Sequence, residues 1–310
     1  MKKNTIIHIG MHKTASTFLQ THVLPKFEDT TLLTRPFTQF NDGFNKLQYQ
    51  DDTLYNREAI LNTINSINTP NIILSDENFS GKLFSFNCIN RTMIAHRLHQ
   101  LVPEATIVVV IRNQIDFIKS AYNHYVKGVY KGKKAIHKFI SHSSKPYNDF
   151  ELHKANDKIN NYPDYLYYNT DDIHLNLDTL KYSKIIELYR SLFPKVRVLL
   201  YEDIKQNPEF FLNVFEEELS QESEWDTSIF RRKENTSLSE ADLYAQIKLN
   251  SSNSNSKFKK ALYKKYYDIT KKTFFRLDEH FIKEYFRLDN QVVLKYLDKK
   301  NVKTFKNTYF

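Results

Sequence analysis

The sequence reads Gly10-Met11-His12-Lys13-Thr14-Ala15-Ser16-Thr17 between an apolar, β-branched run at residues 5–9 and apolar residues at helical spacing from Phe18 onward. Backbone N–H groups at the start of a helix have no partner within the helix and carry the positive end of its dipole, so they attract anions. Lys13 adds a full positive charge, and Ser16 and Thr17 add hydroxyl donors. A strand, this loop and a helix in succession predict a phosphate-binding site.

The loop differs from the phosphate loop of nucleotide kinases. In that motif, G-x-x-x-x-G-K-[ST], a second glycine directly precedes the lysine. Here only two residues separate Gly10 from Lys13, and neither is a glycine. The sequence therefore predicts a phosphate loop of another kind.

Strand and helix patterns alternate along the first 220 residues. Helix-period segments fall at about 16–24, 57–67, 90–101, 114–127, 179–192 and 208–219. Between them lie apolar, β-branched runs that are typical of strands buried on both faces: 5–9, 30–33, 71–74, 106–111 and 196–200. This alternation predicts a three-layer α/β fold, with helices on both faces of a mainly parallel sheet of about five strands. Ligands of such sheets bind at the carboxyl ends of the strands.

We expect a core domain at 1–250 and a basic helical extension at 251–310 that packs on it. Within the core, residues 143–178 are rich in Asn, Asp, Ser and Tyr without clear periodicity, and we interpret them as an irregular insertion that shapes an acceptor pocket. Two stripes of the extension follow helical spacing and are expected to face the core: Phe258, Leu262, Tyr266 and Ile269, then Phe274, Leu277, Phe281 and Tyr285.

The composition restricts the chemistry. Hydrophobic residues make up 41% of the 310, enough for a sizeable core, and the single cysteine, Cys88, excludes an intramolecular disulfide and a cysteine-based metal site. The close histidine pairs lack the His-Glu-x-x-His form, so we expect no metal. The residues before Gly10 are too few for the apolar part of a secretory signal, and the longest apolar run, Ile107–Ile111, is too short to span a bilayer. These features lead us to expect a cytoplasmic protein.

The net charge of +9 is concentrated near the C-terminus. Residues 257–310 hold 15 Lys and Arg against 6 Asp and Glu, and the rest of the chain is balanced. Such a segment is suited to an anionic polymer or to anionic lipid headgroups at the inner face of a membrane, whereas we expect no nucleic acid partner. A plain solvated helix face explains the lysines equally well.

A second candidate anion site follows the fourth predicted strand. Arg112 stands at the end of that strand, and Ser120 lies about two turns along the next helix, opposite its apolar side. Together they could hold a second phosphate. Taken singly, an arginine at this place is often a salt-bridge partner, and a serine on a polar stripe usually faces solvent.

The Lys13 loop followed by Arg-x7-Ser resembles the sulfotransferases that use 3′-phosphoadenosine 5′-phosphosulfate (PAPS). Further segments match in order, namely 201–204, 231–237 and a late Phe-Arg-Leu-Asp-Asn at 286–290 like that of bacterial carbohydrate sulfotransferases. The resemblance implies a 5′-phosphosulfate in the first loop and a 3′-phosphate on a second set of residues. The first set is His12, Lys13, Thr14, Ala15, Ser16 and Thr17, and the second is Arg112, Ser120 and Arg232, with Arg231 beside it.

Two positions depart from the family pattern. Ala15 stands where many members have glycine, and Gln114 stands where many have proline. If Ala15 has to adopt a positive φ, its backbone is strained, and the grip of the loop on the 5′-phosphate is weakened.

The resemblance also implies a base for the acceptor hydroxyl and a cation for the leaving oxygen. Lys13 suits the second role. Family members keep a histidine or glutamate at the end of the third strand, which points to Glu77 as the base, with Asp76 as the alternative. Carboxylates at strand ends also commonly cap the next helix. His8, inside the first strand, is expected to be a buried core residue, and residues 201–203 are expected to order the sheet edge.

Three functions remain open. The first is transfer of a sulfuryl group from PAPS to a hydroxyl of a carbohydrate: a polysaccharide, an oligosaccharide or a lipid-linked glycan. The second is a Mg²⁺-dependent kinase or NTPase, since the apolar strand that ends in Asp76 and Glu77 is similar to the metal-holding strand of phosphoryl-transfer enzymes. The third is a non-catalytic protein that binds anionic polymers through its basic segment.

Overall fold

The computed structural model describes residues 3–34, 43–81, 83, 88–127, 131–133, 136–141, 175–231, 238–270 and 277–310. The chain divides into two compact units. The first comprises Met1–Ile118, Lys181–Thr236 and Glu279–Phe310, and the second comprises Lys119–Leu180 and Ser237–Asp278. The first unit contains the central sheet.

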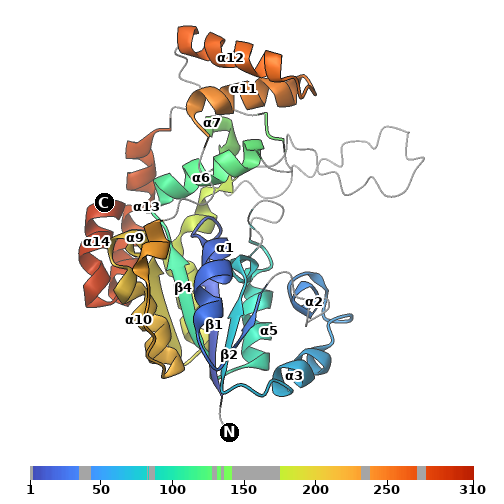
Figure 1. Ribbon diagram of the computed structural model, residues 1–310, viewed down its shortest axis with the longest axis vertical. Helices are drawn as coiled ribbons and strands as arrows, with labels where there is room; N and C mark the ends of the chain where they lie inside the picture. The colour runs from blue at the N-terminus through green and yellow to red at the C-terminus, as the bar shows by residue number, and fades with distance from the viewer. Residues whose placement is uncertain are drawn as a thin grey trace. The chain divides into compact units, whose positions relative to one another are not determined.

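The sheet has five strands in the order β2-β3-β1-β4-β7, and every neighbouring pair is parallel (Figure 1). The three inner strands, β3, β1 and β4, are buried on both faces, as the continuous apolar runs predict, whereas the edge strands β2 and β7 are partly buried. The predicted sheet is confirmed in type and number of strands. Its strands are β1 (Asn4–Gly10), β2 (Thr30–Leu33), β3 (Asn71–Ser75), β4 (Thr106–Ile111) and β7 (Lys195–Leu200).

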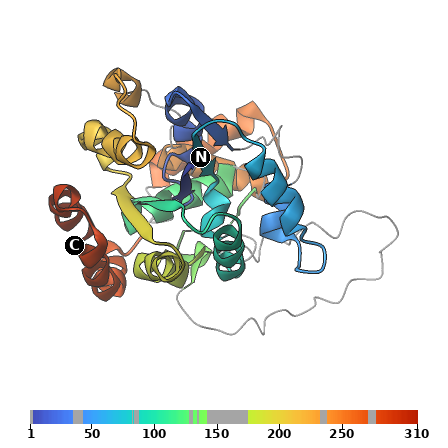
Figure 2. The same ribbon diagram turned by 90° about the horizontal axis from the view of Figure 1, so that it is seen from below.

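Helices cover both faces of this sheet (Figure 2). One face packs Ile6, Val108 and Leu199 against Phe211 and Phe215 and against the helical segment that follows the first loop. That segment, predicted as one helix, is α1 (Ser16–Phe18), the π-helical turn η1 (Leu19–Val23) and the 3₁₀ turn η2 (Leu24–Lys26). The same face holds α9 (Asp203–Gln206), α10 (Pro208–Leu219) and η7 (Thr227–Arg231).

The opposite face carries α5 (Arg91–Leu101) and α8 (Tyr182–Leu192), which contact each other. Helix α13 (Glu279–Val293) also contacts α8, and α14 (Lys299–Tyr309) packs on β7. The remaining elements of this unit are α2 (Gly43–Tyr49), α3 (Arg57–Asn65), η3 (Glu77–Ser80) and η9 (Leu294–Tyr296). The expected three-layer α/β architecture is therefore confirmed.

Helix α14 protects one edge of the sheet. Strand β7 is the last strand on its side, so its outward backbone groups have no neighbouring strand to pair with. Asn301, fully buried on α14, donates from Nδ2 to the Val198 carbonyl oxygen at 3.1 Å. The side chain thus replaces a strand partner at this position.

The second unit is mainly helical. Helix α6 (Gln114–Lys127) begins in the first unit and continues here, where Ala121, Tyr122 and Tyr125 are buried as its periodicity predicts. The other elements are α7 (Ile136–Phe139), the parallel pair β5 (Ile140–Ser141) and β6 (Leu175–Asn176), η6 (Leu177–Leu180), α11 (Glu240–Ser251) and α12 (Lys257–Thr270). Most of the expected insertion, residues 143–174, lies outside the described residues. The expected division at residue 250 falls within α11 and stays a prediction.

The expected core-facing stripe of the basic segment is wrong for α12. Phe258, Leu262 and Tyr266 are 79%, 55% and 49% exposed. Helical spacing shows that a helix has an apolar side but not that another element covers it. Ile269 and Phe274 are not among the described side chains.

The second stripe is wrong in register. Phe281 is 38% exposed, whereas Ile282, Phe286, Asn290 and Val293 are buried. The buried face of α13 is therefore displaced by one residue from the expected one, and it includes a polar side chain, Asn290, which bonds to Gln114 and to the Tyr309 carbonyl oxygen.

None of the helices in the described ranges combines the length and the apolar character that crossing a bilayer requires.

Replacing Asn301 by alanine is expected to lower the free energy of unfolding by about 1–2 kcal/mol, because the Val198 carbonyl oxygen loses its partner in a buried place. We expect a loss near the low end of this range, because the substitution also removes Asn301 Oδ1, a buried oxygen that has no hydrogen-bond partner among the described residues. Urea denaturation measures the change. Asn307→Ala, an exposed asparagine on the same helix, is the matched control, and an equal loss in both variants would contradict the role of Asn301.

Candidate active site

The first loop leaves the sheet between β3 and β4. The Met11 N–H still donates to the Val110 carbonyl oxygen at 3.1 Å, so β1 is held to β4 up to its last residue. The backbone then turns through two left-handed residues, Lys13 with φ 67° and Ala15 with φ 62°. Ala15 is the N-cap of α1, and its carbonyl oxygen accepts from the Leu19 N–H at 3.0 Å. Ala15 thus has the positive φ at which a residue other than glycine is strained, and this conformation costs about 1–2 kcal/mol relative to glycine.

Hydroxyl groups of the loop have different roles. Thr14 is buried, and its Oγ1 donates to the Met11 carbonyl oxygen at 2.5 Å, so this hydroxyl fixes the shape of the loop. Thr17 is exposed. Ser16 is buried, and within the described part of the chain its Oγ has no hydrogen-bond partner. An unpaired buried hydroxyl at the start of a helix is suited to an anionic oxygen of a ligand.

Gly10 leaves the space beside this hydroxyl open. A Cβ atom at position 10 would lie 2.4 Å from Ser16 Oγ and 3.2 Å from Nε2 of His8. His8 Nε2 is also buried without a partner among the residues that the structure describes. Two polar atoms without partners thus lie beside one glycine, and any larger residue there would displace them.

His8 is fully buried in β1, as expected for a core residue. Its Nδ1 lies 2.8 Å from Ser75 Oγ, which also accepts from Gln20 Nε2 at 3.1 Å. When the Ser75 hydroxyl donates to Nδ1, the imidazole proton lies on Nε2. Burial lowers the pKa of His8 from 6.5 to about 4, and the negative charge of Glu77 opposes this effect. His8 is therefore neutral near pH 7, and its Nε2 lies beside Gly10 together with Ser16 Oγ.

Asp76 and Glu77 follow the neighbouring strand β3. Asp76 is fully buried, with Oδ1 accepting from the Asn78 N–H at 2.9 Å and Oδ2 accepting from Gln48 Nε2 at 2.6 Å. This carboxylate caps η3. Glu77 is the first residue of η3 and is half-buried, close enough to His8 to affect its pKa. Of the two candidate bases, the structure gives Asp76 the capping role.

The segment after Glu77 closes on the first loop. His12 Nε2 donates to the carbonyl oxygen of Gly81 at 3.2 Å. Gly81 has φ 93°, and a Cβ atom there would lie 2.7 Å from Cys88 Cβ, so only glycine fits. Tyr189 also donates, through its hydroxyl, to the Phe79 carbonyl oxygen at 2.8 Å. The Lys13 loop and the Glu77 segment are thereby held together.

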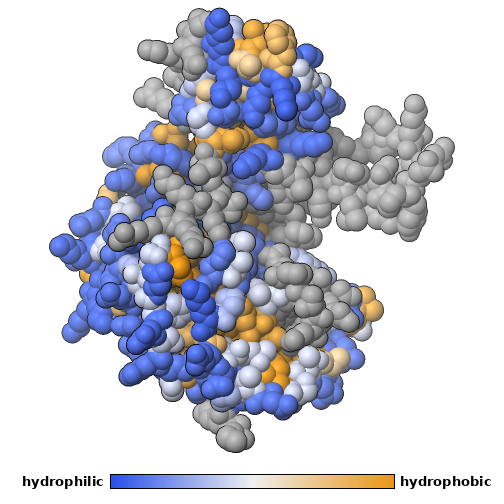
Figure 3. All heavy atoms as spheres, in the orientation of Figure 1, coloured by the Kyte–Doolittle hydropathy of each residue, from blue (hydrophilic) through white to orange (hydrophobic). Residues whose placement is uncertain are grey.

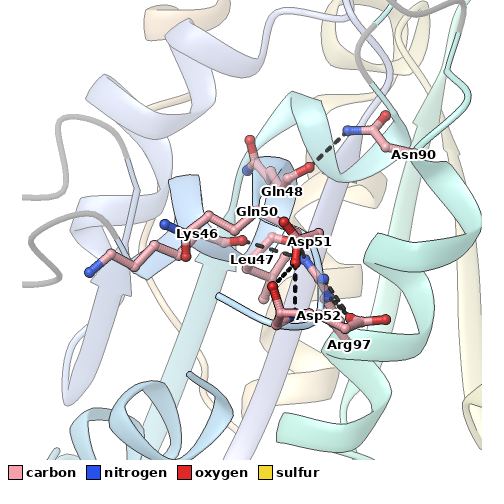
Figure 4. A network of polar contacts seen from close by, with 9 residues as sticks. Lys46, Leu47, Gln48, Gln50, Asp51, Asp52, Asn90 and Arg97 are labelled. Carbon is pink, nitrogen blue, oxygen red and sulfur yellow. Dashed lines mark hydrogen bonds and ion pairs between the residues drawn. The ribbon is translucent and has the colours of Figure 1, made fainter. Parts of the chain in front are cut away.

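A buried arginine on α5, Arg97, fixes the end of α2 (Figure 4). Arg97 Nη1 donates to the carbonyl oxygens of Leu47 and Gln50 at 2.9 and 2.7 Å, at the end of α2. Its Nη2 lies 2.6 Å from Asp52 Oδ1. Asn90 Nδ2 donates to the Gln48 carbonyl oxygen at 3.0 Å, and the Gln48 side chain reaches Asp76. These bonds connect α5 and α2 to the start of η3.

Arg112 joins the second candidate anion site to the first. It follows β4, the other neighbour of β1, and its Nη1 donates to the Lys13 carbonyl oxygen at 2.9 Å. The guanidinium lies over the Tyr201 ring, 4.3 Å from its centroid, and Tyr182 donates to the Arg112 carbonyl oxygen at 2.6 Å. Its Nε is buried and has no partner in the described ranges. One N–H donor of Arg112 is thus available next to the first loop.

Residues after β7 support this arrangement. Glu202 Oε1 accepts from the Asn113 N–H at 2.9 Å, and its Oε2 accepts from the Tyr309 hydroxyl at 3.2 Å. Burial raises the pKa of Glu202. Gln114, at the position where many sulfotransferases have proline, donates from Nε2 to Asn290 Oδ1 at 2.8 Å. Glu202 and Gln114 therefore hold the β4–α6 turn to the C-terminal helices.

Other expected site residues stay predictions. Ser120 is half-buried on the part of α6 that belongs to the second unit. Arg232 lies outside the described residues, as does the side chain of Arg231. No group of three or more His, Cys, Asp or Glu that could hold a metal occurs in the described ranges.

The sequence did not reveal several supporting residues: Gln20, Gln48, Ser75, Arg97 and Tyr182. Each acts through contacts with residues far away in the chain. Two of them left a signal. Ser75 directly precedes Asp76 at the end of an apolar strand, and Arg97 interrupts the apolar side formed by Ile94, Leu98 and Leu101.

Comparison with known proteins agrees with this architecture. No family model matches the chain, and no curated protein matches its sequence. The chain is similar in structure to the crystal structure of a sulfotransferase from Alicyclobacillus acidocaldarius, with a TM-score of 0.53 and 15% identity. The match covers 98% of this chain and 99% of that one. At this identity the likeness concerns the fold, and the chain has a sulfotransferase-like α/β fold.

Neutral His8 makes stability depend on pH. Its pKa is lower in the folded than in the unfolded chain, so its contribution is fully present above about pH 6.5 and is lost as the pH falls toward 4. The expected loss is about 3 kcal/mol. Asp203, whose pKa burial raises to about 7, titrates in the opposite sense, and the test therefore compares two proteins. The difference in unfolding free energy between wild type and His8→Gln should shrink as the pH falls from 6.5 to 4. If the unfolding free energies of the two proteins change in parallel with pH, His8 does not cause the pH dependence.

Proposed function

We propose that the protein is a sulfotransferase that moves a sulfuryl group from PAPS to a hydroxyl of a carbohydrate acceptor. The observation that supports this most directly is the bond between Arg112 and the Lys13 carbonyl oxygen, which joins two anion-binding strand ends in one site. A nucleotide with phosphates at both its 5′ and 3′ positions needs two such groups side by side. The sulfotransferase-like fold supports the same conclusion.

The residues present fit such a donor. Residues 14–17 stand at a helix start, where backbone N–H groups lack partners within the helix, and Ser16 Oγ and His8 Nε2 are buried polar atoms without partners among the described residues. Lys13 brings a positive charge, and Arg112 Nε adds a further donor. When bound, the donor supplies an activated sulfuryl group. The chain's own part is to hold the 5′ end at the first loop and to stabilise negative charge there.

Glu77 is our candidate for the base. It begins η3 at the end of β3, next to the strand that precedes the loop, and its negative charge acts on His8. A carboxylate there can accept the proton of an acceptor hydroxyl, while Lys13 stabilises charge on the phosphate oxygen from which the sulfuryl group departs. Asp76 is less suited to this role because both its oxygens accept hydrogen bonds, one from the Asn78 N–H that caps η3 and one from Gln48 Nε2.

The carbohydrate acceptor rests on the motif resemblance and on the aromatic content of 14%, since tyrosine and phenylalanine faces pack against the apolar faces of sugars. A Mg²⁺-dependent kinase is the competing proposal, favoured by the acidic end of a buried strand beside β1. The loop lacks the glycine before lysine that such enzymes use, and the buried carboxylate of Asp76 is occupied by Gln48.

The first test measures binding of 3′-phosphoadenosine 5′-phosphate by thermal shift and calorimetry, in parallel with ATP and Mg²⁺. The adenosine bisphosphate should raise the melting temperature without Mg²⁺. Lys13→Ala and Arg112→Ala should each weaken its binding by about 10- to 100-fold, because each removes a charged hydrogen-bond donor. Lys26→Ala, an exposed lysine at the end of η2, is the control. Unchanged affinity in both site variants, or stabilisation by ATP with Mg²⁺ alone, would refute the proposal.

The second test concerns the base. Glu77→Gln should lower the rate of radiolabelled sulfuryl transfer to a panel of oligosaccharide and lipid-linked glycan acceptors by about 10²- to 10⁴-fold. Affinity for 3′-phosphoadenosine 5′-phosphate should stay within about threefold, because the substitution does not touch the loop donors. Glu58→Gln, on the exposed surface of α3, is the matched control. If Glu77→Gln keeps the wild-type rate, Glu77 is not the base.

A further inference from the structure

Helix α12 exposes a row of large apolar side chains. Phe258, Leu262 and Tyr266 follow one another at intervals of four residues, so they lie on one side of the helix. All three are exposed, with Phe258 the most exposed of the large hydrophobic residues that the structure describes. Figure 3 shows hydrophobic atoms in orange over α12 with hydrophilic atoms in blue around them. We call these three residues the α12 ridge.

The opposite side of α12 is already occupied. Tyr267 packs its ring on Tyr244 of α11, with centroids 5.5 Å apart, and donates from its hydroxyl to Glu240. Lys264 Nζ lies 3.1 Å from Asp242 Oδ1. Helix α11 holds α12 through the side opposite the ridge, so the ridge faces away from the helix on which α12 packs.

Lysines border the ridge. Helix α12 contains five lysines and one aspartate, and at 100° per residue Lys259 and Lys265 fall on either side of the ridge. Both are exposed. An apolar strip between cationic side chains is the pattern of helices that lie in the plane of a membrane surface, where the apolar residues enter the acyl boundary and the lysines meet anionic headgroups.

From this arrangement we propose that α12 docks on the surface of a bilayer that contains anionic lipids, with its axis parallel to that surface. The helix has 14 residues, which is too short to span a bilayer. Charge complementarity favours a lipid surface, because every charged side chain that is exposed within Lys257–Tyr266 is a lysine. This inference is independent of the proposed reaction.

Two other helices serve as internal comparisons. Helix α14 is basic, with exposed Lys303 and Lys306, but its large apolar residues Phe305 and Tyr309 are buried. Helix α13 exposes two large hydrophobic residues, Phe281 and Leu288, but acidic as well as basic side chains, such as Glu284 and Arg287, are exposed beside them. Isolated exposed hydrophobic residues are common on protein surfaces and require no partner. Of these three helices, α12 alone combines an exposed apolar row with a cationic border.

The experiment is vesicle flotation with the full chain at physiological salt. One set of vesicles contains phosphatidylcholine alone, and the other contains phosphatidylcholine with phosphatidylglycerol. Wild type should float with the anionic vesicles only. Phe258→Ser combined with Leu262→Ser should reduce the floated fraction by at least about 10-fold, as should Lys259→Glu combined with Lys265→Glu.

Matched controls test whether flotation depends on residues of α12 or on the loss of an apolar side chain or of positive charge anywhere on the surface. Leu288→Ser removes an exposed aliphatic residue from α13, and Lys303→Glu with Lys306→Glu removes the same charge from α14; both should float like wild type. All variants are first compared with wild type by circular dichroism and melting temperature. All the substituted side chains are exposed, so these values should not change.

Several results would overturn the proposal. Wild type that stays unbound, or that floats equally with neutral vesicles, excludes an anionic surface as the partner. If the ridge variants float like wild type, the membrane contact lies elsewhere on the protein. If the α14 controls lose as much flotation as the α12 variants, binding depends on the net positive charge of the chain and not on α12. Sedimentation velocity without lipid covers the remaining alternative: a wild-type dimer that the ridge variant turns into a monomer, without flotation, would assign the ridge to a second copy of the chain.

Discussion

The hydrogen bond from Arg112 to the Lys13 carbonyl oxygen is the contact on which the site depends. It connects the residue that follows β4 to the loop that follows β1, and these strands are neighbours in a parallel sheet whose carboxyl ends meet at one edge. Tyr201 below the guanidinium and Tyr182 at its carbonyl oxygen keep the arginine in place. The arginine thus supports the loop and still presents Nε to the same region. A lysine there could not bind in both directions.

The first loop has a backbone conformation that two of its residues do not favour. Lys13 and Ala15 both adopt left-handed backbone conformations that glycine would adopt without strain. The surrounding bonds enforce this shape: Thr14 donates back to Met11, and the Ala15 carbonyl oxygen starts the helix. Strain held by such contacts is typical of sites where backbone N–H groups have to point at a ligand. Gly10 is required for a different reason, which is the space beside Ser16 Oγ.

Much of the fold was predictable from the sequence because strands buried on both faces leave continuous β-branched runs, as in Thr106–Ile111. The Lys13 loop and Arg112 were predictable because each directly follows such a run. Helix α2 was missed, since its end is held by Arg97 of α5 and nothing local marks it. The α12 ridge was assigned to the core because periodicity identifies an apolar side without identifying its neighbour. Contacts between distant segments, such as Gln48 with Asp76, leave no trace in a single sequence.

The position of α14 beside β7 has a consequence for the behaviour of the chain outside its native state. Asn301 supplies a bond that a sixth strand would otherwise supply, and the helix lies where such a strand would add. If α14 detaches, the β7 edge becomes a template for strand addition by another molecule. The packing of α14 on β7 therefore also protects the chain against intermolecular strand pairing at this edge.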